Sequence, residues 1–177
     1  MRQVLDLQLV QFTSSDQLTS LDYPHRGADF SDIGKDMGGE KDGFAHAARA
    51  RAGNILGKWQ YYTGQDWSDE FADARPMVDF SGSEQFSIFP IRKKFIMIMQ
   101  EGHLGRQIFA YTADSPVGPW SAGKLLYVTP LPDTSNLFTY NALAHPQFLE
   151  DSCLLISYNT NSTRLEDHFA DALIYRP

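Results

Sequence analysis

A histidine and an asparagine stand four residues apart on one predicted strand. His145 precedes Pro146, and a residue before proline is restricted to extended conformations. Because side chains alternate along a strand, Asn141 should lie on the same face as His145. The two side chains could hydrogen-bond to sugar hydroxyl groups, and Tyr140 beside them could stack on a sugar ring. Alternatively, His145 bonds to the backbone of a neighbouring sheet and Tyr140 closes the preceding loop.

Other patterns of catalytic or metal-binding residues do not occur in the sequence. The five histidines lack the spacing of zinc ligands, and no G-x-S-x-G nucleophile motif exists. The glycines of residues 37–43 are not followed by the Lys-Ser/Thr of a phosphate-binding loop. We therefore predict no metal site and no cofactor. Four acidic residues of one polar segment do not match the spacing of a calcium-binding loop: Asp32, Asp36, Glu40 and Asp42.

The composition limits the partners that the chain could take. Its 177 residues carry a net charge of −7 and are enough for a domain with a real core. This acidic balance argues against binding to nucleic acid or to an anionic membrane, because both require clustered Lys and Arg. No apolar run could span a bilayer, and the first residues lack the features of an export signal. The single Cys153 excludes an internal disulfide and is expected to be a buried, inert thiol.

The chain divides at the sequence level into residues 1–43 and 44–177. Residues 4–12 alternate as a strand does, and residues 13–43 are rich in Asp, Ser and Gly, which predicts a long loop. From residue 44 onward, short apolar runs alternate with polar turns, which is typical of an antiparallel all-β meander. The run 44–50 is rich in alanine, and a helical turn is an alternative there. The basic residues 92–94 read as a hairpin turn.

Two pairs of similar segments indicate an internal repeat. Trp67 and Trp120 both follow a Tyr-Thr strand end and a polar turn, and they lie 53 positions apart. Pro90 and Pro146, each inside a strand before a charged turn, lie 56 positions apart. A period near 55 residues with about four strands is the size of a β-propeller blade, so we predict about three blades. Each Trp would pack between blades where a third strand turns into a fourth. A β-sandwich with a chance spacing of tryptophans is the alternative.

Two strings resemble segments of a known family. They are 112-TADSPVGPWSAGKLLYVTP-130 and 140-YNALAHPQFLEDSCLLISYNTN-161. Both are similar to segments of five-bladed β-propellers related to arabinanase- and xylosidase-type glycoside hydrolases, and of uncharacterised DUF4185-like propeller domains. The resemblance covers residues 44–177 and implies secretion and a central funnel that faces a sugar. Three blades cannot close a ring of five, so it also implies a homo-oligomer or the remainder of a longer chain.

The resemblance further implies where catalytic carboxylates would lie. In these hydrolases, separate blades each supply one carboxylate, and Glu84 stands just before an apolar strand, where the general acid would be. Hydrolysis of a glycoside needs a second carboxylate roughly 5–10 Å away. Asp79 is the nearest in sequence, and Asp114 and Glu101 are alternatives, Glu101 also as a substrate-binding residue. Glu84 could instead be a solvated turn residue.

Two functions follow from these expectations. The first is carbohydrate binding, with or without hydrolysis, in a funnel of polar residues. The second is a non-catalytic interaction or assembly module whose exposed blade edges pair with another chain. A hydrolase requires two convergent carboxylates from different blades. An assembly module predicts a funnel without an acid pair and a stable oligomer.

Overall fold

A computed structural model describes residues 7–13, 44–51, 54, 56–102, 104–131, 136–170 and 174, without the side chains of residues 7–13 and Glu84. The polar loop predicted for residues 13–43 thus lies outside the described residues, apart from Thr13. The chain forms two compact units, Met1–Ser81 and Gly82–Pro177. No helix among the described residues is long and apolar enough to cross a membrane.

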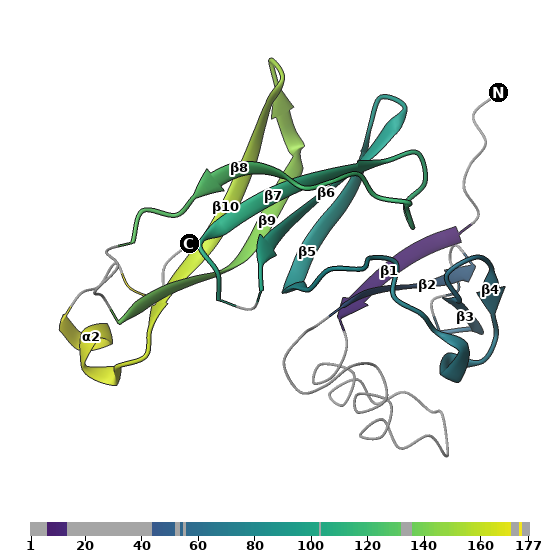
Figure 1. The fold of residues 1–177 in the computed structure, drawn as a ribbon, viewed down its shortest axis with the longest axis horizontal. Coiled ribbons are helices and arrows are strands. Elements are labelled where there is room, and N and C mark those ends of the chain that lie inside the picture. Colours follow the sequence, from purple (N-terminus) through teal and green to yellow (C-terminus); the bar gives the residue numbers. More distant parts are fainter. Residues whose placement is uncertain are drawn as a thin grey trace. The chain divides into compact units, whose positions relative to one another are not determined.

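The first unit contains a four-stranded antiparallel sheet (Figure 1). The alanine-rich run forms strand β2 and not a helical turn. Four of its alanines are almost fully buried, because small side chains on both faces of a strand let other elements approach closely. In spatial order the strands are β1 (Leu7–Thr13), β2 (Ala45–Arg51), β3 (Trp59–Tyr62) and β4 (Trp67–Ser68).

Aromatic side chains complete the core of the first unit. Trp59 and Tyr61 of β3 pack against Ala48, Ala50 and Ala74 in one buried cluster. A short 3₁₀ helix, η2 (Phe71–Asp73), places the ring of Phe71 edge-on to Tyr61, with the ring centroids 5.0 Å apart. Such edge-to-face pairs contribute about 1 kcal/mol beyond the burial of their area.

The second unit begins with another four-stranded antiparallel sheet. Its strands, in sequence and in spatial order, are β5 (Gly82–Ile91), β6 (Lys94–Glu101), β7 (Gln107–Ala113) and β8 (Lys124–Val128). The basic run does form the predicted turn between β5 and β6, and Arg92 there adopts a φ of 56°.

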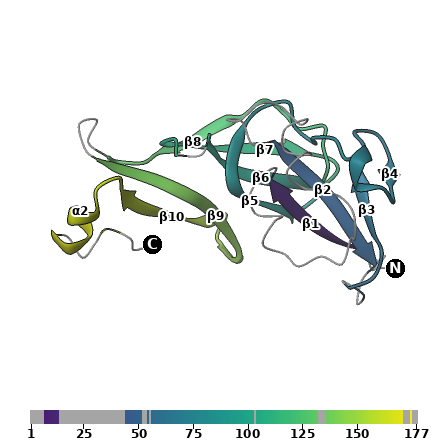
Figure 2. The ribbon, with the colours of Figure 1, turned by 90° about the horizontal axis from the view of Figure 1, so that it is seen from below.

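A long hairpin follows this sheet and packs on one of its faces (Figures 1 and 2). It consists of β9 (Leu137–Glu150) and β10 (Cys153–Ser162), and α2 (Leu165–Ala170) comes after it. Asp151 and Ser152 both have positive φ, as a tight two-residue hairpin turn requires. Phe89, Ile98 and Ile108 of the sheet form a core cluster with Ala142 of the hairpin; packed against it are Ile91, Ile96, Ala110, Ala144, Leu154, Ile156 and Tyr158.

The strand order confirms an all-β fold built from antiparallel, four-stranded sheets. Trp67 begins the fourth strand of its sheet, and Trp120 lies between the third and fourth strands of the next one. Pro90 and Pro146 lie in β5 and β9, the first strands of their units of the repeat. The positions predicted for these four residues within a repeating unit are therefore the observed ones. Among the described residues, the third repeat consists of two strands.

Candidate functional site

The predicted binding residues Tyr140, Asn141 and His145 all lie on β9, and a bulge sets their directions. Thr139 and Ala142 are both fully buried on the side of β9 that faces the sheet. The Gln100 amide of β6 donates to the Thr139 hydroxyl at 3.1 Å, and Ala142 belongs to the core cluster that contains Ile98. Regular alternation would send these two residues to opposite faces. The pairing with β10 accordingly shifts register between Ser157 and Asn159.

Asn141 is the residue that absorbs the bulge. Its φ is 57°, in the left-handed region that asparagine tolerates better than most residues. An extra residue of this kind re-aims the side chains that follow it along the strand. Beyond the bulge, Ala142 and Ala144 belong to the core that faces the sheet, so His145 points to the opposite side of the hairpin.

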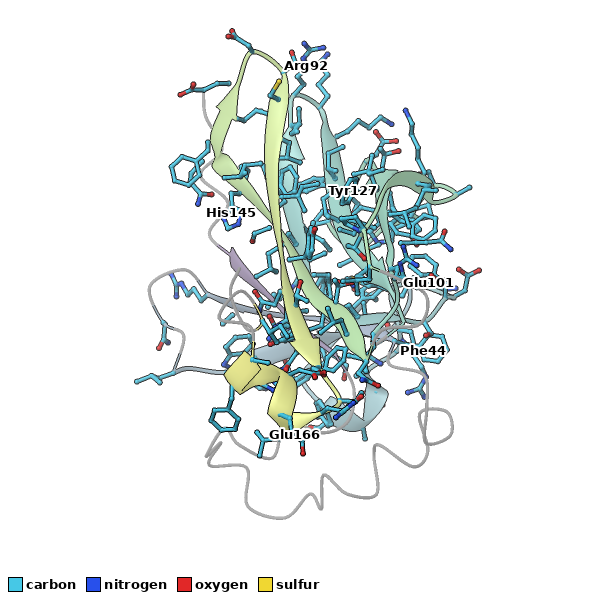
Figure 3. All side chains as sticks on the ribbon, turned by 90° about the vertical axis from the view of Figure 1, so that its left-hand side faces the viewer. Phe44, Arg92, Glu101, Tyr127, His145 and Glu166 are labelled. Atoms are coloured by element: carbon cyan, nitrogen blue, oxygen red, sulfur yellow. The ribbon has the colours of Figure 1, made fainter. Side chains whose placement is uncertain are left out.

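His145 has a hydrogen-bond partner on the neighbouring strand. Its Nε2 lies 2.7 Å from the Oγ of Ser157, and its ring centroid lies 6.4 Å from that of Phe148. Figure 3 shows His145 on one side of the hairpin and Tyr127 on the other. The partner is thus the side chain of Ser157, whereas the sequence had suggested the backbone of another sheet.

We name His145, Phe148, Leu155 and Ser157 the hairpin site. Leu155 pairs with His145 across the two strands, and Phe148 and Leu155 are 59% and 52% exposed. The site therefore combines an exposed aromatic ring with an imidazole and a hydroxyl that already hydrogen-bond to each other. Sequence reasoning missed Phe148, Leu155 and Ser157, because only the register of the hairpin shows which residues of β10 lie beside His145.

Tyr140 lies farther along the same strand. Its ring centroid is 5.8 Å from that of Phe138, and it pairs with Asn159 of β10. Their partners on β10, Asn159 and Leu155, are four residues apart, which at about 3.3 Å per residue separates Tyr140 from His145 by roughly 13 Å. Tyr140 and His145 consequently cannot contact the same sugar ring, and one ligand that reached both would have to be an oligosaccharide.

The predicted carboxylates do not form a defined pair among the described side chains. Glu84 lies on β5, and its side chain is outside the described part. Glu101 is the exposed last residue of β6, while Asp79 is exposed in the first unit. Asp114 forms an exposed ion pair with Lys94 at 2.7 Å. Catalysis by Glu84 and Asp79 stays a prediction.

A buried network of polar side chains joins β9 to the sheet β5–β8. Besides its bonds to Thr139 and Ala142, the Gln100 amide donates to the carbonyl of Gly105. The hydroxyls of Thr129 and Thr139 lie 2.9 Å apart. Each of these side chains is almost fully buried and hydrogen-bonded, which fixes the position of β9 on the sheet.

His46 is the fully buried histidine of β2 in the first unit. Burial lowers its pKa to about 4, and the positive charge of Arg75 acts in the same direction. A hydrogen bond with the Arg75 backbone offsets part of this effect. The imidazole is therefore neutral at pH 7. Within the described part of the chain, no three His, Cys, Asp or Glu residues are arranged to hold a metal ion.

The exposure of Cys153 contradicts the prediction made from the sequence. The thiol predicted to be buried is exposed at the start of β10. The apolar run 153–158 resembles a central strand, but Cys153 is the first residue of β10 and directly follows the hairpin turn at Asp151 and Ser152.

The two repeated tryptophans make local packing contacts. The Arg49 guanidinium lies 4.2 Å from the ring centroid of Trp67, a cation–π contact. Trp120 packs beside Gly118, where an added Cβ would come within 2.9 Å of the indole Cδ1. Glycine is thus required there both by this contact and by a φ of 93°. Both contacts lie within one repeating unit, so packing of the two tryptophans between blades stays a prediction.

A comparison with solved structures shows a fold that this chain shares with another protein. A crystal structure of a "putative hydrolase" from Bacteroides ovatus matches with a TM-score of 0.64 and 21% sequence identity, over 76% of this chain and 38% of that one. The chain thus spans about two fifths of the length of that protein. No curated protein matches the sequence. The model of the domain of unknown function DUF5005 matches residues 33–177, and the chain therefore belongs to the DUF5005 family.

Proposed function

We propose that the chain binds carbohydrate through the hairpin site. The observation that carries this proposal is the pair His145–Ser157, which lies beside the exposed ring of Phe148 on the face of the hairpin that points away from the sheet. A sugar offers an apolar ring face for stacking and hydroxyls that both donate and accept hydrogen bonds. An aromatic ring next to a fixed polar pair matches both features.

The hydrogen bond to Ser157 also orients the imidazole. Nε2 is engaged with the Ser157 hydroxyl, and no described residue bonds Nδ1, which is left for a ligand hydroxyl. Because the hydroxyl holds the ring in place, less side-chain entropy is lost when the ligand binds. Tyr140 and Asn141 would then contact a more distant ring of the same oligosaccharide.

Binding alone is the activity that the hairpin site supports. None of its four residues is a carboxylate, and hydrolysis of a glycoside needs two. Hydrolysis is the second candidate function, favoured by the fold that the chain shares with the "putative hydrolase". It would depend on Glu84 as the general acid and Asp79 as the second carboxylate, so it is separable from binding at the hairpin site.

Calorimetric titration of the chain with a panel of oligosaccharides tests the proposal. We expect at least one ligand to bind, with Phe148→Ala or His145→Ala weakening it about tenfold or more, equivalent to about 1.4 kcal/mol. Leu149→Ala is the matched control, since this neighbour is also exposed and apolar but lies outside the site, and it should change nothing. Absence of binding to the whole panel, or equal binding by Phe148→Ala and the unchanged chain, would refute the proposal.

The same panel separates binding from hydrolysis. If the chain cleaves a ligand, Glu84→Gln should abolish cleavage and leave the dissociation constant unchanged. Cleavage that survives this substitution would remove Glu84 from the candidate catalytic residues.

A further inference from the structure

The sheet of the first unit carries a connected row of polar side chains on the face opposite to its aromatic cluster. The Arg49 guanidinium of β2 donates from Nε and Nη2 to Gln60 Oε1 of β3, at 2.9 and 2.8 Å. The Gln60 amide donates to Asp69 Oδ1 at 3.1 Å, and Lys58 Nζ donates to Asp69 Oδ2 at 2.5 Å. Because Ala48, the neighbour of Arg49, lies in the aromatic cluster, alternation puts Arg49 on the other face.

The guanidinium of Arg49 is held in one plane. It stacks on Trp67, 4.2 Å from the ring centroid, while Gln60 accepts its Nε and Nη2 hydrogens. The described residues provide no acceptor for Nη1. The edge formed by Nη1 and Nη2 therefore has N–H donors left for a second, bidentate partner such as a planar carboxylate. We name Arg49, Gln60, Trp67 and Asp69 the arginine site.

No carboxylate of the described residues forms an ion pair with Arg49. Asp69 is bonded to Lys58. The side chain of Asp66 accepts the backbone N–H of Trp67 at 2.8 Å. Partial burial lowers the pKa of Arg49, because the guanidinium loses hydration, and the negative charge of Asp66 offsets only part of this effect. Arg49 thus carries a positive charge that is partly removed from water, a state that a bound anion would stabilise.

The second repeat shows that the fold does not require polar residues at these positions. The Tyr-Thr segments that the two repeats share align Gln60 with Phe109. Across the sheet, Gln60 pairs with Arg49. Phe109 pairs with Met99, which is 2% exposed. The second unit thus has an apolar pair where the first has a bonded polar pair, and a departure of this kind from a shared architecture indicates a functional position.

We propose that the arginine site binds an acidic saccharide, with the carboxylate of a uronic acid unit on the Nη1–Nη2 edge of Arg49. The carboxylate would lie in the plane of the guanidinium, where two parallel N–H···O bonds form. The exposed carboxylate of Asp69 has lone pairs left to accept hydrogen bonds from the hydroxyls of the same ligand. The arginine site belongs to the first unit and shares no residue with the hairpin site.

The charges around the arginine site favour a ligand with few negative groups. Three cations lie there, namely Arg49, Lys58 and, two positions along β2 on the same face, Arg51. The carboxylates of Asp66 and Asp69 offset two of them, which leaves one net positive charge in a chain of net charge −7. A uronic acid unit fits this balance, because it has one carboxylate and several hydroxyls that can donate to the two aspartates. A peptide rich in Asp and Glu would set further carboxylates against them.

Calorimetric titration of the 177-residue chain with oligomers of galacturonate, glucuronate and mannuronate tests the proposal. We expect at least one oligomer to bind, and its methyl ester, which lacks the negative charges, to bind at least tenfold more weakly. A peptide of the same charge should also bind at least tenfold more weakly. Absence of binding by all three oligomers, or equal binding of the methyl ester, would overturn the proposal. Tighter binding of the peptide would overturn it in favour of a protein partner.

Substitutions of Arg49 test the site itself. Arg49→Met introduces the residue that the second repeat has at this position, and it should weaken uronate binding at least tenfold. Arg49→Lys keeps the charge but loses the planar fork of donors, so it should weaken binding about as much. Far-UV circular dichroism checks that both variants are folded. Binding that survives either substitution would overturn the assignment to Arg49.

Two controls separate this site from the rest of the chain. Lys124→Met removes a positive charge from an exposed residue of the second unit and should leave uronate binding unchanged. An equal loss with Lys124→Met and Arg49→Met would show that net charge, and no defined site, drives the binding. Phe148→Ala in the hairpin site should also have no effect, so the outcome does not depend on the function proposed for that site.

Discussion

The sheet β5–β8 and the hairpin β9–β10 begin alike and end differently. Each starts with a long strand that contains a proline and turns tightly into a second apolar strand. In the sheet, Met97, Ile98 and Met99 of β6 are at most 2% exposed. In the hairpin, Leu155 of β10 is 52% exposed. The two second strands have similar apolar sequences, so their different burial comes from their surroundings in the fold.

Strands β6 and β10 both contribute apolar side chains to the core between the sheet and the hairpin. Ile98 of β6 and Ile156 of β10 belong to the same core cluster. The sheet and the hairpin therefore share one core on that face, and the far face of the hairpin carries the hairpin site.

The largest expected effect compares one apolar residue from each strand. Ile98→Ala removes a fully buried side chain from the shared core and should lower the free energy of unfolding by about 3 kcal/mol. Leu155→Ala should lower it by less than about 0.5 kcal/mol, because this side chain is already half in water. Urea unfolding of the two variants measures both losses. Equal losses would show that the two strands have equivalent surroundings.

The stability of the first unit should depend on pH through His46, which the sheet and hairpin of the second unit do not contain. The pKa of His46 lies near 4 in the folded chain, below its ordinary value of 6.5, so the unfolded state binds the proton more readily. The stabilisation is complete above pH 6.5 and is lost as the pH falls to 4, by on the order of 3 kcal/mol at most.

Calorimetric unfolding between pH 7 and pH 4 measures this loss. His46→Gln should flatten the pH dependence of the first unit, whatever its effect at pH 7. His145→Gln is the control, because this partly exposed histidine belongs to the second unit. A pH dependence that survives His46→Gln would assign the acid sensitivity to other groups.

The smallest effect concerns the bulge that distinguishes β9. Asn141→Val forces a β-branched residue to a φ of 57° and should cost about 1–2 kcal/mol. Asn141→Gly relieves the steric restriction and should change stability by less than about 0.5 kcal/mol. Thermal unfolding of the two variants measures the difference in stability between them. If valine were tolerated as well as glycine, β9 would not need the left-handed residue, and the direction of His145 would have another cause.

Local chemistry makes much of this fold predictable. Alternation of apolar residues and the turn residues between them indicate an antiparallel all-β protein, since both signals act over a few neighbouring positions. The spacing of Trp67, Trp120, Pro90 and Pro146 likewise places each residue within a repeating antiparallel unit. For the site, the sequence alone identifies β9 as the strand that carries Tyr140, Asn141 and His145.

The tertiary structure decided what lies beside these residues. The bulge at Asn141 changes which side chains face the core, and the register of β9 with β10 brings Ser157 to His145. Cys153 is exposed beside the hairpin turn, a position that its own apolar run does not reveal. The alternation of apolar residues and the choice of turn residues depend on neighbours in the chain, so they can be predicted from the sequence. Register, burial and the partner of an edge depend on contacts between distant segments, and only the folded chain determines them.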